Sequence, residues 1–178
     1  MCDHLEGNNE SVPRLGCGAA IIDQSRILLV ERKRSPEADH WGLPGGKIES
    51  GEGVEDAVVR EIMEELGITI QLMRRICTVD HRDDSTGQRW IAEVYSASIL
   101  SGTPRICEPH ALAAVEWFAL DRLPSPLTAA TVQTIRALGG GLRLQDDPRF
   151  LCRIERARGC LQAGQGTRLE DVGDVETE

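Results

Sequence analysis

One stretch, residues 42–68, constrains this chain more than any other, and its sequence is GLPGGKIESGEGVEDAVVREIMEELGI. Its second half places Glu61, Glu64 and Glu65 at spacings of three and four residues from the first, which bring side chains to one face of a helix. Apolar residues recur at every fourth position beside them, so the pattern predicts a helix over residues 54–66 with one buried edge. Carboxylates gathered at the border of a core repel one another. A hard divalent cation would relieve this repulsion, and Mg²⁺ prefers carboxylate and water oxygens.

The residues around this helix indicate where it begins and ends, and whether its glutamates form a binding site or a solvated face. Gly53 can act as the N-cap, and Gly67 stands where a helix ends in the left-handed conformation. Taken alone, the glutamates could also form an acidic, solvated face in which Arg60 makes an i, i+4 ion pair with Glu64. The turn at residues 43–46, LPGG, favours a site instead, because its glycines have no side chains that would keep other groups away.

The whole stretch resembles the signature of the Nudix hydrolases. That signature is a Gly, five residues, a Glu, seven residues, and then Arg-Glu-apolar-any-Glu-Glu-any-Gly-apolar. Every fixed position is filled here, in order by Gly46, Glu52, Arg60, Glu61, Ile62, Glu64, Glu65, Gly67 and Ile68. A pattern of this length is much more specific than a lone G-x-G-x-x-G.

The resemblance implies a fold, a reaction and a set of site residues. The fold class is α/β: the Nudix α/β/α sandwich, with a mixed β-sheet between helices. The reaction is hydrolysis of a nucleoside diphosphate linked to a further group, with Mg²⁺, or Mn²⁺ in its place, as cofactor. The implied metal ligands are Glu61, Glu64, Glu65 and Gly46. Arg60 would orient these glutamates, and Glu52 would support the site.

A substrate-binding role follows for Arg32 by the same resemblance. Arg32 belongs to the basic run ERKR at residues 31–34, and in similar enzymes the Arg that closes this strand contacts substrate phosphate. Its planar fork suits that work, because it can hold two oxygens at once. Gly45 and Gly46 would line the same substrate site. The alternative for such a run is a solvated strand end.

Glu108 is the remaining candidate. It matches an acidic residue that reaches the metal site in the MutT-like branch of the family. Glu61 and Glu108 are therefore the two candidates for the general base that deprotonates water, with Glu64 and Arg60 completing the catalytic set. We expect Glu108 to lie on a loop that can move, and its alternative role is that of a turn carboxylate next to Pro109.

The substrate expected first is a (d)NTP or an oxidised (d)NTP, cleaved to the monophosphate and pyrophosphate. ADP-ribose pyrophosphatases of the family place a Pro beyond the signature and diadenosine polyphosphate hydrolases a Tyr, whereas residues 82–86 here read RDDST. The region around Glu108 and Trp117 also resembles the MutT-like branch. ADP-ribose or a nucleotide sugar is the alternative substrate. A domain that only senses a nucleotide is the alternative of another class, and the complete set of signature carboxylates disfavours it.

Composition sets broader limits. Of the 178 residues 40% are hydrophobic, and the formal net charge is −9, which fits one domain and disfavours binding to nucleic acid, RNA caps included, or to an anionic membrane. The six cysteines include no C-x-x-C pair, and the first residues lack the regions of a signal peptide. We therefore expect a cytoplasmic protein with reduced thiols, a monomer or homodimer whose partner is a small-molecule nucleotide.

The remaining patterns predict the order of the elements. Residues 1–14 are expected to form a flexible N-terminal arm, 15–140 the Nudix hydrolase domain, and 141–178 a C-terminal extension with a short helix over 146–161 and a disordered last part. Strands are predicted at Cys17–Ile22, Arg26–Val30, residues 68–79 with a break near Gln71, Arg89–Ile99 and residues 114–119. A second helix is predicted over residues 127–138, with Pro126 in its first turn.

Overall fold

Strand β1 (Arg14–Asp23) is the strand around which the sheet is built. It is buried without interruption from residue 16 to residue 21, a run that is typical of a strand covered on both faces. Most of β1 pairs in parallel with β5 (Arg89–Ser101). Its end turns back through Gln24 and Ser25, both with positive φ, into the antiparallel strand β2 (Arg26–Arg32). The predicted hairpin of the first two strands is therefore confirmed.

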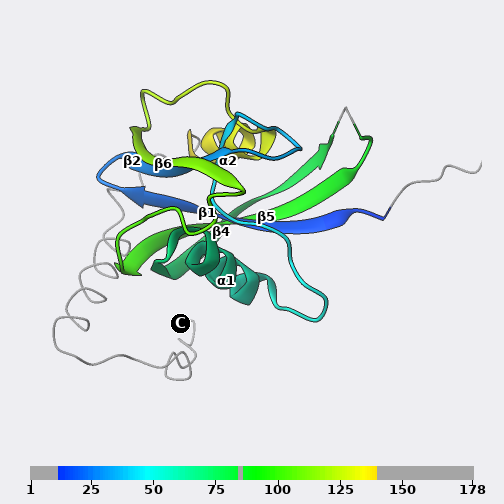
Figure 1. Cartoon of the computed structure of the whole chain (residues 1–178), viewed down its shortest axis with the longest axis horizontal. Helices are drawn as coiled ribbons and strands as arrows, with labels where there is room; N and C mark the ends of the chain where they lie inside the picture. The colour runs from blue at the N-terminus through cyan, green and yellow to red at the C-terminus, as the bar shows by residue number, and fades with distance from the viewer. Residues whose placement is uncertain (1–11, 84–85, 140–178) are drawn as a thin grey trace, which may run out of the picture.

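The computed structural model describes residues 12–83 and 86–139, arranged as Figure 1 shows. Besides β1, β2 and β5, the elements are β3 (Trp41–Gly42), α1 (Val54–Leu66), β4 (Thr69–Arg82), β6 (Leu112–Ala119) and α2 (Ala129–Gly139). The strands form one mixed sheet in the order β3-β2-β1-β5-β4, with β6 paired to β2. The predicted extension after residue 140, with its helix over 146–161, lies outside the described residues. So does most of the predicted N-terminal arm, and Arg14 already belongs to β1.

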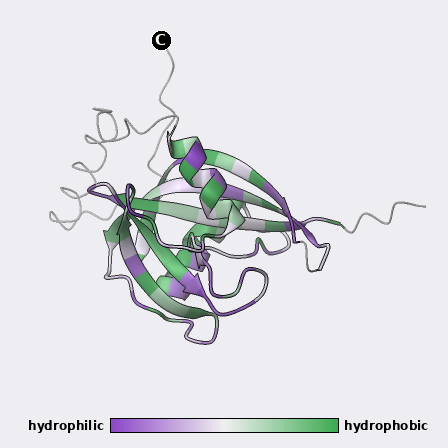
Figure 2. Cartoon of the chain, turned by 90° about the horizontal axis from the view of Figure 1, so that it is seen from above, coloured by the Kyte–Doolittle hydropathy of each residue, from purple (hydrophilic) through white to green (hydrophobic). Residues whose placement is uncertain are grey.

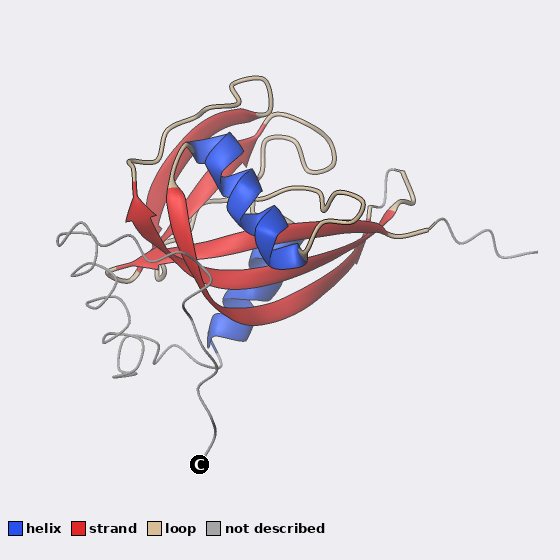
Figure 3. Ribbon diagram, turned by 90° about the horizontal axis from the view of Figure 1, so that it is seen from below, coloured by secondary structure: helices blue, strands red, loops and turns tan. Residues whose placement is uncertain are grey.

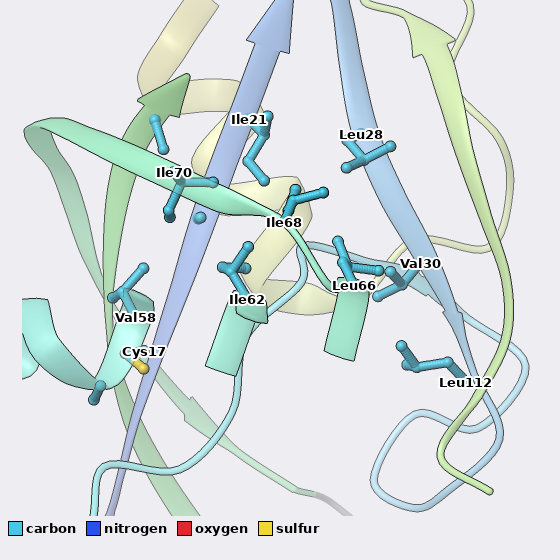
Figure 4. Packing of buried hydrophobic residues seen from close by; sticks show 13 residues of the cluster. Cys17, Ile21, Leu28, Val30, Val58, Ile62, Leu66, Ile68, Ile70 and Leu112 are labelled. Carbon is cyan, nitrogen blue, oxygen red and sulfur yellow. The ribbon is translucent and has the colours of Figure 1, made fainter. Parts of the chain in front are cut away.

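The two helices cover opposite faces of this sheet, α1 on one side and α2 on the other (Figures 1 and 3). The strands supply both faces, because successive side chains of a strand point to opposite sides. In β2, Leu28 and Val30 pack in the cluster that holds the buried face of α1 (Figure 4). Ile27 and Leu29 pack in the second cluster, together with residues of α2. Figure 2 shows the resulting mixture of apolar and polar positions along the strands and α2. This arrangement confirms the predicted α/β sandwich.

Helix α1 begins and ends where the sequence predicts. Gly53 precedes it in an extended conformation, and Gly67 follows it in the left-handed conformation with its N–H bonded to Met63 O at 2.9 Å. Strand β4, in contrast, shows no break at Gln71 and continues to Arg82. Irregularities in its pairing with β5 replace the predicted break; two of them lie between Leu72 and Arg74 and between Arg75 and Cys77.

The second helix starts later than predicted, and Pro126 is not in its first turn. The backbone before the helix is hydrogen-bonded to β3: Trp41 N donates to Pro126 O, and Thr128 N donates to Trp41 O, both at 2.9 Å. Leu127 thereby forms a parallel β-bridge with Trp41, so the backbone at this position is extended rather than helical. Thr128 instead caps α2, with its Oγ1 accepting from Thr131 N at 3.3 Å. In the part of the chain that the structure describes, no helix is long and apolar enough to cross a membrane.

Candidate active site

The glycine turn of residues 44–48 lies against the first half of β1. Cys17 N donates to Gly46 O at 2.9 Å, and Ile48 N donates to Leu15 O at 3.1 Å. This edge of β1 is available because β2 pairs only with the last residues of β1. At Gly45, where φ is +140°, a Cβ would lie 2.3 Å from Cys17 O, so only glycine fits. The turn is thus fixed to the central strand by its backbone.

Helix α2 supports this turn from the other side. Leu43 N, just before the glycines, donates to Thr131 Oγ1 at 3.0 Å. Thr131 is fully buried, and its hydroxyl also lies 2.8 Å from Thr128 Oγ1. The first turn of α2 therefore helps to fix the backbone just before the glycine turn.

Glu65 of α1 points into the glycine turn. Glu65 is only 8% exposed, and its Oε2 accepts a hydrogen bond from Gly45 N at 2.8 Å. Burial raises the pKa of this carboxyl to about 8; the Gly45 bond and the charge of Arg32 oppose the rise, while Glu61 and Glu108 add to it. The structure thus brings three of the sequence candidates, on three different elements, within electrostatic reach of one carboxylate.

Glu61 stands one turn earlier on α1, under Gly46. A Cβ at residue 46 would lie 2.3 Å from Glu61 Oε2, so the carboxylate fills the space that a side chain would need. Partial burial raises the pKa of Glu61, the Arg60 bond lowers it, and Glu64 and Glu108 raise it further. Glu64 is the outermost of the three glutamates, with half of its side chain exposed.

Arg60 binds several acidic side chains at once. Its Nε and Nη2 donate to the two carboxylate oxygens of Glu52, at 2.7 and 2.9 Å. Its Nη1 donates to Glu61 Oε1 and Glu64 Oε2, each at 2.9 Å. The bidentate bond with Arg60 lowers the pKa of Glu52 to about 2. The simple ion pair between Arg60 and Glu64 exists, therefore, but as one part of a network that joins the loop before α1 to its carboxylates.

The segment carrying Glu108 is fastened to the end of α1. Arg105 N donates to Leu66 O at 3.1 Å, and Cys107 N donates to Glu65 O at 2.8 Å. These are carbonyls of the last helical turn, which have no partner within the helix. Glu108 O in turn accepts from Ala111 N and Leu112 N, each at 3.0 Å. Four backbone bonds therefore support the positions around Glu108, which the sequence predicts to lie on a loop that can move.

Arg32 closes β2 and is held by the loop that follows. Its Nε donates to Pro36 O at 3.2 Å, and its backbone N donates to His40 O at 3.0 Å. That loop is tied to the start of α2, because Glu37 Oε1 accepts from Ala129 N at 2.6 Å. Arg32 is half-buried, and its charge is close enough to Glu65 to lower the pKa of that carboxyl. Arg32 therefore lies beside the carboxylates rather than at a solvated strand end.

Trp117 lies away from the cluster of carboxylates and Arg32, whereas Lys33 contacts the segment after Glu108, a contact that the sequence did not predict. Trp117 pairs with Leu28 in the middle of β2, away from Arg32, and its ring lies 5.7 Å below the guanidinium of Arg26. The sequence assigned no separate role to Lys33, although its Nζ donates to Pro109 O at 2.7 Å. The basic run that contains Lys33 was the available signal, but the acceptor lies 76 residues further along the chain.

The donor set fits a hard divalent cation in its chemistry. Glu61, Glu64, Glu65 and Glu108 supply only oxygen ligands. Burial and mutual repulsion disfavour the charged forms of Glu61 and Glu65, and a bound cation would offset this penalty. Gly46 O accepts one bond and keeps a lone pair for a cation. Within residues 12–83 and 86–139, no three His, Cys, Asp or Glu side chains converge as a complete ion site. Arg60 holds oxygens of two of the glutamates here, so these side chains would have to adjust to a cation.

Residues 12–138 match the family model described as NUDIX domain. Over 114 residues the chain is 29% identical to the oxidized purine nucleoside triphosphate hydrolase of Mus musculus, a match covering 64% of this chain and 71% of that protein. Over 112 residues it is 32% identical to the ADP-ribose pyrophosphatase of Methanocaldococcus jannaschii, covering 63% and 65%. A solved MutT NUDIX hydrolase from Burkholderia pseudomallei superposes with a TM-score of 0.67 at 53% identity, covering 72% of this chain and 99% of that one. The matches thus span about two thirds of the two curated relatives.

Proposed function

The chain belongs to the NUDIX domain family of hydrolases, and from this premise we propose that it is a pyrophosphohydrolase that depends on Mg²⁺ or Mn²⁺. Its proposed substrate is a (d)NTP or an oxidised (d)NTP, which it cleaves to the monophosphate and pyrophosphate. The observation that carries the proposal is the meeting of carboxylates from α1 and from the segment before β6 with Arg32 and the glycine turn. Carboxylates that could bind a cation and a guanidinium that could bind phosphate thus lie around a single site.

Each residue has a definite part in the proposed reaction. Glu61, Glu64 and Glu65, with Gly46 O, would hold the cation, which when bound neutralises charge on the phosphate oxygens. Arg60 keeps the glutamates in place through the bonds described above. The Nη groups of Arg32 would bind phosphate oxygens, because among the described residues its guanidinium bonds only through Nε. A carboxylate oxygen of Glu61 or Glu108 would accept the proton of the attacking water.

The choice of substrate rests on the relatives and on the sequence. The mouse relative is named for oxidised purine nucleoside triphosphates, and the Burkholderia pseudomallei structure is named MutT. The archaeal relative is named for ADP-ribose, which keeps ADP-ribose or a nucleotide sugar as the second candidate. We further propose that the protein acts on free nucleotides as a monomer or homodimer in the cytoplasm, without a nucleic acid or membrane partner, in keeping with its net charge of −9.

A hydrolysis screen tests this proposal. The full chain is incubated with Mg²⁺ and, separately, with each dNTP, 8-oxo-dGTP and ADP-ribose, and the products are separated by ion-exchange chromatography. We expect kcat/KM to be highest for a triphosphate and pyrophosphate to be released in equal amount to the monophosphate. Faster hydrolysis of ADP-ribose would favour the second candidate. Tight binding of a nucleotide without hydrolysis would identify a sensing domain and contradict the proposal.

A further inference from the structure

Lys33, the residue that follows β2, contacts the segment that carries Glu108. Its Nζ donates to Pro109 O at 2.7 Å. Its backbone N donates to Ala111 O at 2.8 Å. Both acceptors come within three residues after Glu108. Lys33 therefore fixes the C-terminal side of this carboxylate with two hydrogen bonds, one from its side chain and one from its backbone.

The N-terminal side of Glu108 is fixed by the last turn of α1, through the bonds of Arg105 N and Cys107 N to helix carbonyls. Glu108 thus lies between two supports that come from different parts of the chain. The Glu108 carboxylate disfavours the charged forms of Glu61 and Glu65, because like charges repel one another. Its place beside them must therefore be maintained by the contacts of its neighbours rather than by attraction.

The end of β2 explains how two consecutive basic residues can serve one site. Successive residues of a regular strand point to opposite faces of the sheet. Lys33, however, lies beyond the last residue of β2, so this alternation does not apply to it. Arg32 acts on Glu65, and Lys33 reaches Pro109.

We propose that Lys33 is a positioning residue, which holds Glu108 beside Glu61 and Glu65 through the carbonyl of Pro109. The inference rests on the proposed function, in which Glu108 either takes a proton from water or helps to hold the cation. Lys33 touches no reacting atom in this role. The competing roles are a direct contact with substrate phosphate and a solvated side chain.

A double-mutant cycle separates these roles. Lys33→Met removes the donor and keeps the aliphatic stem, and it is measured alone and with Glu108→Gln. Alone it should lower kcat by ~3–10-fold, the range for one hydrogen bond, while KM stays within about twofold of the parent. With Glu108→Gln it should cause no further loss. Lys33→Arg should recover part of kcat, because a donor is restored. The matched control is Arg34→Met, which removes a charge from the next residue, exposed like Lys33, and should leave kcat unchanged.

Three kinetic results would overturn the inference. The first is an equal loss from Lys33→Met in both backgrounds. The second is a rise in KM with kcat unchanged, which would indicate a contact with substrate. The third is parent-like activity of Glu108→Gln, because Lys33 would then have no catalytic group to position.

Hydrogen exchange provides a measurement that needs no substrate. In Lys33→Met, the amides of residues 105–112 should exchange ~3–10-fold faster than in the parent, in line with the loss of one hydrogen bond. Arg34→Met should leave them unchanged. Unchanged exchange in Lys33→Met contradicts the inference even if the protein hydrolyses nucleotides. Faster exchange in a protein that hydrolyses no nucleotide would contradict the proposed function, while the support of this segment by Lys33 would stand.

Discussion

Gly46 lies directly against Glu61: a Cβ on residue 46 would stand 2.3 Å from Oε2 and 2.4 Å from Cδ of that carboxylate. The glycine turn cannot retreat easily, because Cys17 N is bonded to Gly46 O. The turn on β1 therefore determines where the first carboxylate of α1 can lie. The signature glycine is thus required at position 46 because a side chain would occupy the space of the Glu61 carboxylate, not because of its backbone conformation.

Gly46→Ala should lower kcat by ~10²-fold, because a displacement of about 1 Å at a catalytic group can cost that much. It should also raise the Mg²⁺ concentration at half-maximal rate, because Glu61 would move from its place. Steady-state kinetics with a Mg²⁺ titration check both effects. Gly53→Ala is the control, because its Cβ would meet only the flexible Asp56 carboxylate, at 3.1 Å. Parent-like kinetics of Gly46→Ala would show that Glu61 has no fixed role.

The buried carboxyl of Glu65 predicts how the metal-free protein responds to pH. Its pKa is raised from 4.5 to about 8, so between these values the folded protein holds a proton that the unfolded chain has lost. The free energy of unfolding should therefore fall as the pH rises from about 5 to 8, by up to a few kcal/mol. Urea unfolding in EDTA at several pH values measures this slope.

Glu65→Gln should flatten that slope and leave the protein at least as stable as the parent at pH 8. The exposed Glu55 on the same helix supplies the control, since Glu55→Gln should leave the slope in place. In the presence of Mg²⁺, Glu65→Gln should lower turnover by at least ~10²-fold, the low end for a positioned catalytic group. Near-normal turnover would remove Glu65 from the metal ligands.

Arg32 should contribute to substrate binding through its two Nη groups. Arg32→Ala should weaken binding of a non-hydrolysable triphosphate analogue by ~1.5–3 kcal/mol, the range for a hydrogen bond to a charged partner. Arg32→Lys should recover only part, because the planar fork is lost. Calorimetric titration measures the affinities, with Arg34→Ala as the control for loss of charge. Equal affinities for the parent and both Arg32 variants would show that Arg32 is merely a solvated residue.

Glu61 and Glu108 can be told apart by two measurements made side by side. Glu61→Gln should raise the Mg²⁺ requirement, because Glu61 shares α1 with the other proposed ligands. Glu108→Gln should leave that requirement unchanged and flatten the acidic limb of the pH–rate profile, as expected for loss of a general base. If Glu108→Gln matches the parent in both, Glu108 is only a turn residue and Glu61 must perform both roles.

The sequence by itself determined the elements whose signals are local. The limits of α1 agree with the prediction because Gly53 and Gly67 act on their immediate neighbours. The hairpin of β1 and β2 is also read correctly, since both strands are apolar and the turn between them is short. The signature and its spacing indicated the family for the same reason, because its positions lie in one loop, one helix and the two residues that follow the helix.

Tertiary structure decided everything that depends on residues far apart in the chain. The start of α2 shifted because Trp41 bonds to the backbone of Pro126 and Thr128. Glu65 is buried because Gly45, on a turn fixed to β1, meets it. Glu108 has its place because the carbonyls at the end of α1 bind the segment before it and Lys33 binds the segment after it. Spacing along a helix determines which carboxylates share a face, but burial and fixation come from contacts between elements, which no local pattern encodes.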